Sequence, residues 1–349
     1  MSLGISACPF HLLFKHPFGT AHGVRSGTDS VFVRLEQDGV FGHGEATMPP
    51  YVPEDQGSVL AVLASLDLTG IDLPSDLGIL LARSMHLVGS APCARAALTT
   101  AAFDLAGKLL NRPTWQMLEV PEPVGARMMF TLGLCAFDHI PTRISELPEC
   151  DVLKVKLDGS LDIERTAIIK GHWSKALFLD VNQGWRTEQQ ANVVLDAIQG
   201  IQVAGIEQPY PKDDLETNRL LQRWGRATVF ADESVQGLPD VRDRGQGFGG
   251  VNIKLMKCGG LDQAKAMAEI ARANGQQVLL GSMSESSLGC TAAAHLSGTA
   301  DLLDLDGPWL IVNDPFKGIG TRKGRLTLPE GPGLGVDQTA QLDFSSICA

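Results

Sequence analysis

Three short apolar runs, each ending in an acidic residue, constrain what this chain can fold into. They are Ala176–Asp180, Val203–Glu207 and Val229–Asp232. An apolar run of this length between turn residues is typical of a strand that is covered on both faces. The acids follow one another after 27 and 25 residues (180 to 207 and 207 to 232), about the length of a strand, a helix and two loops. We therefore predict three neighbouring parallel strands whose carboxyl ends bring three carboxylates together.

Three carboxylates held that close repel one another, and a proton or a bound cation must relieve the repulsion. The three acids are Asp180, Glu207 and Asp232. Ligation by oxygen alone favours Mg²⁺, with Mn²⁺ as an alternative, over Zn²⁺. Taken singly, each acid could equally be a helix cap or a surface charge. Three acids in phase with a strand repeat favour a metal site instead.

From Met128 onward, apolar segments alternate with helix-like stretches. The segments lie near residues 128–133, 152–157, 176–181, 203–207, 228–232, 250–255, 277–281 and 302–306. Seven of the eight are followed by helix-like stretches, such as Asp162–Ile169, Glu188–Ile198 and Asp262–Ala273. This repeat indicates an α/β protein with a (β/α)₇β TIM-like barrel, because an open sheet fits eight such units less well.

The chain before the barrel has a different pattern. Two alternating segments, Val31–Glu36 and Val40–Ala46, flank the turn Asp38-Gly39 and predict a hairpin. A helical pattern follows and includes the alanine-rich stretch Ala91–Leu110. Strands followed by helices predict a separate α+β domain.

At 349 residues the chain exceeds the usual size of one core, and we predict three parts. They are an α+β domain at residues 1–120, a barrel at 121–315 and a Gly- and Pro-rich segment at 316–349 that returns to the α+β domain. The net charge of −11 argues against nucleic acid and membrane partners. The seven scattered cysteines without a C-x-x-C pair, and the lack of an apolar leader, predict a soluble cytoplasmic protein with reduced thiols.

Lysines occur inside two of the apolar runs. Lys154 and Lys156 lie two positions apart, so both face the barrel mouth if their strand is buried. An isolated K-x-K is more typical of an exposed edge strand, but the rest of 152–157 is apolar. Two buried like charges would lower each other's pKa, which suits a lysine that acts as a base. Lys254 lies within the sixth apolar run.

Strands two and six lie on opposite sides of a closed barrel. Lys156 and Lys254 would therefore face each other across the mouth, with the three acids between them. A divalent cation that binds a substrate carboxylate stabilises the enediolate formed when the α-proton leaves. One lysine would remove this proton and the other would return it on the opposite face, which inverts the configuration.

The complete motif set resembles the enolase superfamily, and within it the muconate-lactonizing-enzyme-like branch. The motifs are K-x-K at 154–156, D-x-N at 180–182, E-Q-P at 207–209, D-E-S at 232–234, N-I-K-x-x-K-x-G-G at 252–260 and G-x-G-E-A at 42–46. The resemblance covers the whole chain and implies that the N-terminal part is an α+β capping domain. It also implies a homo-oligomer.

The same resemblance implies roles for the motif residues. Asp180, Glu207 and Asp232 would bind one Mg²⁺ per subunit, and Lys156 and Lys254 would be the acid/base pair. Three further side chains would have supporting roles: Lys154 would contact the substrate carboxylate, and Asn182 and Glu233 would hold the metal ligands in place.

The remaining strand ends select among the reactions of the superfamily. Strand seven, within Val278–Glu285, has no histidine, which disfavours the mandelate-racemase-like branch. Asp304 and Asp306 at the end of strand eight could bind an ammonium group, although alone they could also form a turn or helix cap. This D-x-D resembles that of dipeptide epimerases, where it binds the substrate's free α-ammonium group. We therefore predict an isomerase that inverts the C-terminal α-carbon of a dipeptide.

Several alternatives stay open. An N-acylamino acid racemase, an o-succinylbenzoate synthase or a muconate cycloisomerase would share the core residues. A barrel that only binds a carboxylate through Mg²⁺ would also fit. The preferred side chains and the pathway are not predicted.

Loops near 18–26 and 48–58 are expected to close over the substrate. Five residues are candidate substrate contacts: Arg25, Tyr51 and Glu54 from these loops, and Ser282 and Met283 from strand seven, where packing roles are equally compatible.

Overall fold

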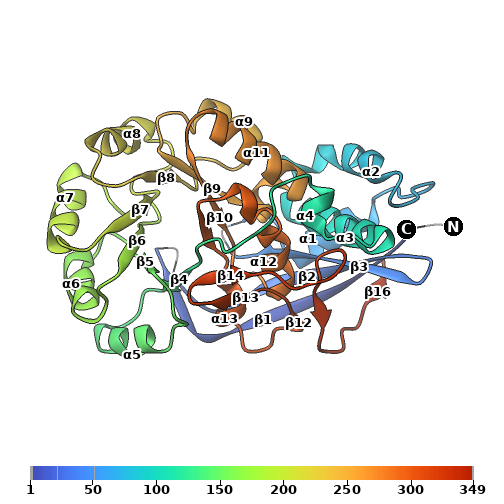
Figure 1. The fold of residues 1–349 in the computed structure, drawn as a ribbon, viewed down its shortest axis with the longest axis horizontal. Helices are drawn as coiled ribbons and strands as arrows, with labels where there is room; N and C mark the ends of the chain where they lie inside the picture. The colour runs from blue at the N-terminus through green and yellow to red at the C-terminus, as the bar shows by residue number, and fades with distance from the viewer. Residues whose placement is uncertain (1–2, 22, 51, 348–349) are drawn as a thin grey trace.

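The computed structural model describes residues 3–21, 23–50 and 52–347, and it contains a parallel barrel and an antiparallel sheet domain (Figure 1). The barrel strands are β4 (Met129–Leu132), β5 (Val152–Lys156), β6 (Ala176–Asp180), β7 (Val203–Glu207), β8 (Val229–Ala231), β9 (Gly250–Lys254), β10 (Gln277–Gly281) and β11 (Leu302–Asp304). Neighbours in the sheet follow chain order. A parallel bridge between Met128 and Leu303 closes the ring. The predicted barrel and its eight apolar segments are confirmed.

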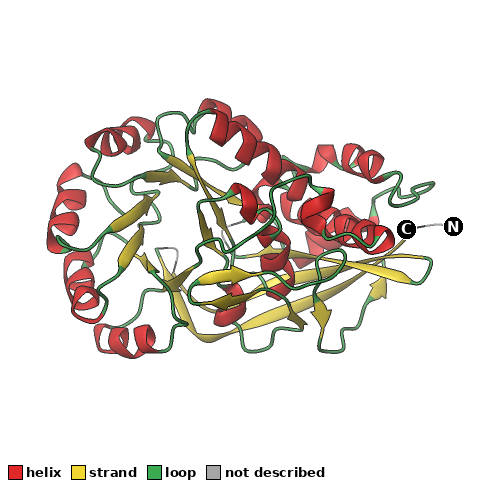
Figure 2. Cartoon of the chain, viewed as in Figure 1, coloured by secondary structure: helices red, strands yellow, loops and turns green. Residues whose placement is uncertain are grey.

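Helices cover the outer face of the barrel (Figure 2). The helices that follow the barrel strands in the chain are α5 (Ile140–Ser145), α6 (Asp162–His172), α7 (Glu188–Ala197), α8 (Leu215–Trp224), α9 (Leu238–Asp243), α10 (Leu255–Cys258), α11 (Leu261–Ala273), α12 (Ser287–Ala294) and α13 (Gly307–Leu310). Inside the barrel, Phe178 and Phe230 pack with their ring centroids 5.3 Å apart. Since the strands are covered by helices outside and by side chains inside, they read as unbroken apolar runs.

The capping domain contains β1 (Gly4–Thr20), β2 (Gly23–Gln37) and β3 (Val40–Met48), with α1 (Gln56–Ala64), α2 (Leu77–Arg83), α3 (Pro92–Leu110) and α4 (Thr114–Met117). The predicted turn is present, with positive φ at Asp38 (54°) and Gly39 (77°). The long helix α3 lies directly on β3. A Cβ atom at Gly44 would come 1.9 Å from the carbonyl oxygen of Ala97, so this strand needs glycine where α3 crosses it.

The C-terminal segment contains short strands: β12 (Phe316–Lys317), β13 (Gly320–Arg322), β14 (Arg325–Thr327), β15 (Asp337–Gln338) and β16 (Ser345–Ser346). Strand β16 pairs with β1 and extends the capping sheet to the order β16-β1-β2-β3. This pairing supports the predicted return of the segment, while the exact domain boundaries stay a prediction.

One predicted loop is part of a sheet. Phe18 pairs with Arg25, and Gly19 pairs with Val24, across β1 and β2. The segment is therefore the tip of a long hairpin and not an irregular loop. A bridge between Gly19 and Leu134 brings this tip against the barrel.

Buried charged side chains join the capping domain to the barrel. Arg95 of α3 is fully buried and contacts Asp262 of α11 through two ion-paired hydrogen bonds of 2.9 and 2.8 Å. Glu45 of β3 accepts hydrogen bonds from the backbone nitrogens of Ser286 (3.0 Å) and Gly289 (2.9 Å), at the N-terminus of α12. These contacts fix the hairpin over the carboxyl ends of the barrel strands.

Within the described residues, no helix is both long and apolar enough to cross a membrane. The described cysteines, six in number, are all free thiols. Reduced cysteines were expected from the sequence.

Candidate active site

A cavity of about 310 Å³ lies at the carboxyl ends of the barrel strands, beneath the hairpin tip. The barrel contributes Lys156, Asp232, Lys254, Asp304 and Asp306 to its wall, and the capping domain contributes Phe18, Thr20 and Arg25. This end of a TIM-like barrel is where active sites form. The cavity size is within the range of small-molecule sites.

The three acids of the predicted metal site lie on adjacent strands. Asp180 and Glu207 are register partners at the ends of β6 and β7, and Asp232 directly follows β8. All three are buried. Burial and the charge of Asp180 raise the pKa of Glu207 to about 8, because a second negative charge is unfavourable so close to the first.

Lys154 lies at the centre of this acidic group. It is buried and forms ion pairs with three carboxylates, at 2.9 Å from Asp180 Oδ2, 2.7 Å from Glu207 Oε2 and 2.5 Å from Asp304 Oδ2. Burial alone would lower the pKa of Lys154, but these carboxylates raise it well above its usual value. Our prediction of a lowered pKa was therefore wrong for this lysine, because nearby acids outweigh the second lysine. Lys154 does not line the cavity in this arrangement.

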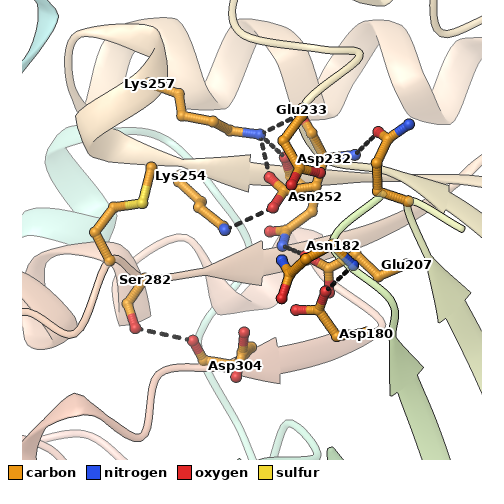
Figure 3. Close-up of polar contacts among 12 residues, drawn as sticks. Asp180, Asn182, Glu207, Asp232, Glu233, Asn252, Lys254, Lys257, Ser282 and Asp304 are labelled. Atoms are coloured by element: carbon orange, nitrogen blue, oxygen red, sulfur yellow. Dashed lines mark hydrogen bonds and ion pairs between the residues drawn. The ribbon is translucent and has the colours of Figure 1, made fainter. Parts of the chain in front are cut away.

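Two further lysines, Lys156 and Lys254, form ion pairs with the aspartates of the predicted metal site. Lys156 Nζ lies 2.6 Å from Asp180 Oδ2. Lys254 Nζ lies 2.8 Å from Asp232 Oδ2 (Figure 3). Burial opposes ionisation of Asp180, but the charges of Lys154 and Lys156 lower its pKa to about 2. The pKa of Asp232 is likewise well below its usual value. Burial would raise it, but the positive charges of Lys254 and Lys257 have the larger effect.

Lys156 and Lys254 come from opposite sides of the ring. Their strands, β5 and β9, are four places apart in a closed order of eight. Both side chains line the same cavity. The predicted placement of two amines around one space is thus present in the fold.

Lys257, which the sequence analysis placed in the motif at 252–260 without giving it a role, is a central residue of the site. Its ammonium donates to Asp232 Oδ1 (2.6 Å), Asp232 O (2.8 Å), Val235 O (2.9 Å) and Asn252 O (3.0 Å). The available signal was its position three residues after Lys254, inside an apolar stretch. Since all its hydrogens are directed at fixed acceptors, Lys257 holds Asp232 in place.

Asn252 is a second residue whose role was missed. Its Nδ2 donates to Glu207 Oε1 at 2.7 Å (Figure 3). Asn252 points into the barrel from β9 and is fully buried. It therefore orients the carboxylate of Glu207 from two strands away.

The donor set fits a hard divalent cation, although the carboxylates bind lysines here. Within the described ranges, no three His, Cys, Asp or Glu side chains converge on one metal position. The three acids are nevertheless on adjacent strands and buried, and the pKa values of Asp180 and Asp232 are lowered. The amide oxygen Oδ1 of Asn182, which is buried beside them, has no hydrogen-bond donor among the described residues. An all-oxygen set of this kind suits Mg²⁺ or Mn²⁺.

Asp304 and Asp306 both face the cavity from the end of β11. Asp306 accepts a hydrogen bond from the backbone nitrogen of Thr131 at 2.6 Å. Burial and the charge of Asp304 raise its pKa to about 7. Ser282 donates its hydroxyl hydrogen to the carbonyl oxygen of Asp304 at 3.2 Å (Figure 3). The pair thus presents carboxyl oxygens to a ligand from a firmly held strand end.

Most of the remaining candidate contacts line the cavity. These are Arg25, Asn182, Glu233, Ser282 and Met283. The guanidinium carbon of Arg25 lies 5.4 Å from the ring centre of Phe14, a cation–π contact. Tyr51 lies outside the described residues.

Glu54 requires a correction. Its carboxylate accepts hydrogen bonds from the backbone nitrogens of Cys93 (2.8 Å) and Ala94 (3.0 Å), at the start of α3. It is buried there and does not line the cavity. A carboxylate binds the free N–H groups of a helix start strongly, which draws the side chain away from the substrate space.

Comparisons with known proteins agree with this architecture. Residues 6–119 match the mandelate racemase / muconate lactonizing enzyme N-terminal domain, and residues 144–342 match the enolase C-terminal domain-like family. An L-Ala-D/L-Glu epimerase of Bacteroides thetaiotaomicron is 37% identical over 332 residues, which cover 94% of this chain and 86% of that protein.

Two solved structures have the same fold over nearly the whole chain. The L-Ala-D/L-Glu epimerase from Bacillus subtilis, in a substrate-liganded complex, has a TM-score of 0.87 and 27% identity and covers 98% of this chain and 100% of that one. A dipeptide epimerase from Enterococcus faecalis, complexed with Mg and L-Leu-L-Tyr, has a TM-score of 0.84 and 27% identity, with coverage of 97% and 100%.

Proposed function

The chain belongs to the mandelate racemase/muconate lactonizing enzyme family of the enolase superfamily, and from this premise we propose that it is a dipeptide epimerase. It would invert the α-carbon of the C-terminal residue and interconvert L,L- and L,D-dipeptides. One observation carries this proposal: a single cavity is lined by two opposed lysines, Lys156 and Lys254, and by the pair Asp304 and Asp306.

Two groups of acids would bind opposite ends of the dipeptide, one directly and one through a metal ion. Asp304 and Asp306 would bind the α-ammonium group, because two carboxyl groups at one strand end offer it several acceptors. Asp180, Glu207 and Asp232 would hold one Mg²⁺, or alternatively Mn²⁺, with Asn182, Glu233, Asn252 and Lys257 keeping these ligands in place. When bound, this ion supplies positive charge next to the substrate carboxylate and so makes the neighbouring α-proton more acidic.

The two lysines would carry out the proton transfer. The lysine that faces the α-hydrogen accepts it in its neutral form, and the other, as an ammonium, donates a proton to the opposite face of the planar carbon. The carbon–hydrogen bond that breaks and the one that forms are on opposite faces, so the configuration inverts. After the transfer, the lysine that was neutral is an ammonium and the lysine that was an ammonium is neutral. This is the state that the reverse reaction requires.

The substrate's C-terminal side chain would lie against Arg25, Ser282 and Met283. Lys154 would stabilise the substrate carboxylate by its charge, from its place beneath the cavity. Burial in a closed site strengthens such electrostatic contacts.

The experiment is a screen of L,L-dipeptides in deuterated water with Mg²⁺, read by mass spectrometry and chiral chromatography. We expect one deuterium at the C-terminal α-carbon and appearance of the L,D-epimer, both lost on removal of the divalent ion. Absence of exchange with every dipeptide would leave a carboxylate-binding barrel as the function.

An N-acylamino acid racemase is the second candidate, because it would use the same acids and lysines. Asp306→Asn separates the two. It should lower kcat/KM for free dipeptides by at least tenfold, since the ammonium group loses a charged partner, and it should leave N-acylated amino acids unaffected. A larger effect on the acylated substrate would favour the second candidate.

A further inference from the structure

A second cavity, of about 170 Å³, is also lined by Asp306, but not by the two lysines. It shares four wall residues with the first cavity: Phe18, Thr131, Asp306 and Leu310. The two spaces are therefore adjacent, and the carboxyl group of Asp306 lies at their boundary. Nothing in the mechanism above uses this second space.

Apolar side chains form its interior. Phe130 of β4 is almost completely buried and meets the ring of Trp309 edge-on, with centroids 5.2 Å apart and planes at 88°. Leu132 and Leu147 complete this part of the wall. The pocket has fixed walls, because Phe130 belongs to a barrel strand and the aromatic pair is closely packed.

Besides Asp306, charged residues border this cavity at a rim where the capping hairpin meets the end of α5. His16 Nε2 lies 2.6 Å from Glu146 Oε2, and Lys15 Nζ lies 3.3 Å from the same oxygen. Arg143 also borders the space. Glu146 is thus already shared by two basic groups.

We propose that this second cavity receives the side chain of the dipeptide's N-terminal residue, and that the preferred N-terminal residue is large and apolar. The inference rests on the proposed function, since it takes the ammonium group to be bound by Asp304 and Asp306. The N-terminal α-carbon is one bond from that ammonium group. The side chain of the N-terminal residue is therefore attached beside Asp306, which borders the second cavity.

The size of the cavity favours a leucine- or phenylalanine-sized group. An engineered apolar cavity of about 150 Å³ binds benzene, and this one is slightly larger. The methyl group of alanine would leave most of the space without contacts. Burying the additional apolar surface of leucine is expected to raise kcat/KM at least tenfold over alanine.

The rim charges select against cationic side chains. An N-terminal lysine or arginine would place its charge near Lys15 and Arg143, while Glu146 is already paired. The positive charge of the substrate side chain would be repelled by these two basic residues. Leucine should therefore be preferred over lysine, although the lysine side chain also has an apolar stem.

The test compares N-terminal Ala, Leu, Phe and Lys with the C-terminal residue fixed, in two series that end in L-Ala and L-Glu. Exchange of the C-terminal α-proton is followed in deuterated water. We expect kcat/KM for Leu and Phe to exceed that for both Ala and Lys at least tenfold in each series. Equal or faster exchange with Ala overturns the inference while the proposed function stands. No exchange with any member overturns the proposed function itself.

Variants at Leu147, two residues after the end of α5, locate the effect. Leu147→Phe and Leu147→Trp fill the second cavity and should reduce the Leu-to-Ala ratio of kcat/KM stepwise, to near one in the Trp variant. Ser145→Trp is the matched control, because Ser145 is exposed at the end of α5, two residues before Leu147, and does not line the cavity; its ratio should equal that of the wild type. An unchanged ratio in both Leu147 variants contradicts the assignment, and the wild-type substrate series decides even if a variant fails to fold.

Discussion

Arg95 of α3 and Asp262 of α11 meet across the boundary between capping domain and barrel, with Nη1–Oδ1 at 2.9 Å and Nη2–Oδ2 at 2.8 Å. The arginine is fully buried and also donates to the carbonyl oxygen of Gly259. Removing one partner of a buried ion pair leaves the other charge uncompensated. We predict that Arg95→Met lowers the free energy of unfolding by about 3 kcal/mol, measured by chemical denaturation.

The control for this prediction is Arg223→Gln. Arg223 and Glu216 form an ion pair 2.6 Å long on the surface, where more than half of each side chain is exposed. Exposed pairs contribute at most about 1 kcal/mol. If Arg95→Met were no more destabilising than this surface variant, the interdomain pair would have no structural role.

The opposed lysines predict a difference between the two epimers. In Lys156→Ala only Lys254 can remove a proton, and in Lys254→Ala only Lys156 can. Each variant should lose epimerisation at least a hundredfold but retain α-proton exchange with one epimer, and the two variants should retain it with opposite epimers. NMR of the L,L- and L,D-dipeptides in deuterated water measures this directly. Loss of exchange with the same epimer in both variants would exclude two separate bases.

Lys257 predicts an effect on the metal. In Lys257→Met the carboxylate of Asp232 loses the donor at 2.6 Å that fixes its orientation. Loss of such a supporting contact lowers metal affinity about 10- to 100-fold, which Mn²⁺ titration followed by electron paramagnetic resonance would detect. Lys265→Met, which removes a partly exposed lysine paired with Glu269 on α11, should bind Mn²⁺ normally. Unchanged affinity in Lys257→Met would show that Asp232 needs no support.

Glu285 predicts a pH dependence of stability. Burial and the charge of Glu45 raise the pKa of Glu285 from its ordinary value of 4.5 to about 8. The folded protein therefore keeps a proton that the unfolded chain releases above pH 4.5, and this contribution to stability declines as the pH rises toward 8. Glu285→Gln stays neutral, so its stability relative to the wild type should increase from pH 5 to pH 8. A pH-independent difference in denaturation midpoints would mean that Glu285 is ionised in the folded state.

The barrel strands, and the charged residues at their ends, were predictable because a buried strand appears in the sequence as a short run of apolar residues. A charged residue inside an apolar run, such as Lys156 or Asp180, must have a partner or a task. The regular distance between the acids then placed them on neighbouring strands. The turn at Asp38-Gly39 was equally local, since it depends on residues that accept positive φ.

Long-range partners were not predictable in this way. Glu54 caps α3 from 39 residues earlier in the chain, and its neighbouring sequence says nothing of that helix start. The high pKa of Lys154 depends on Asp304, 150 residues away. Lys257 was given no role, because the fold brings its acceptors on Asp232 and Val235 to it from more than 20 residues earlier in the chain.

The pairing of β16 with β1 has a consequence for assembly. The first strand of the chain obtains its outer neighbour from residues more than 300 positions later, Ser6 facing Ser346. Until the intervening polypeptide has become compact, that border of β1 offers free amide and carbonyl groups to any other extended chain. Contacts between such distant positions form late. Refolding at high protein concentration should therefore produce intermolecular association through β1, and dilution should suppress it.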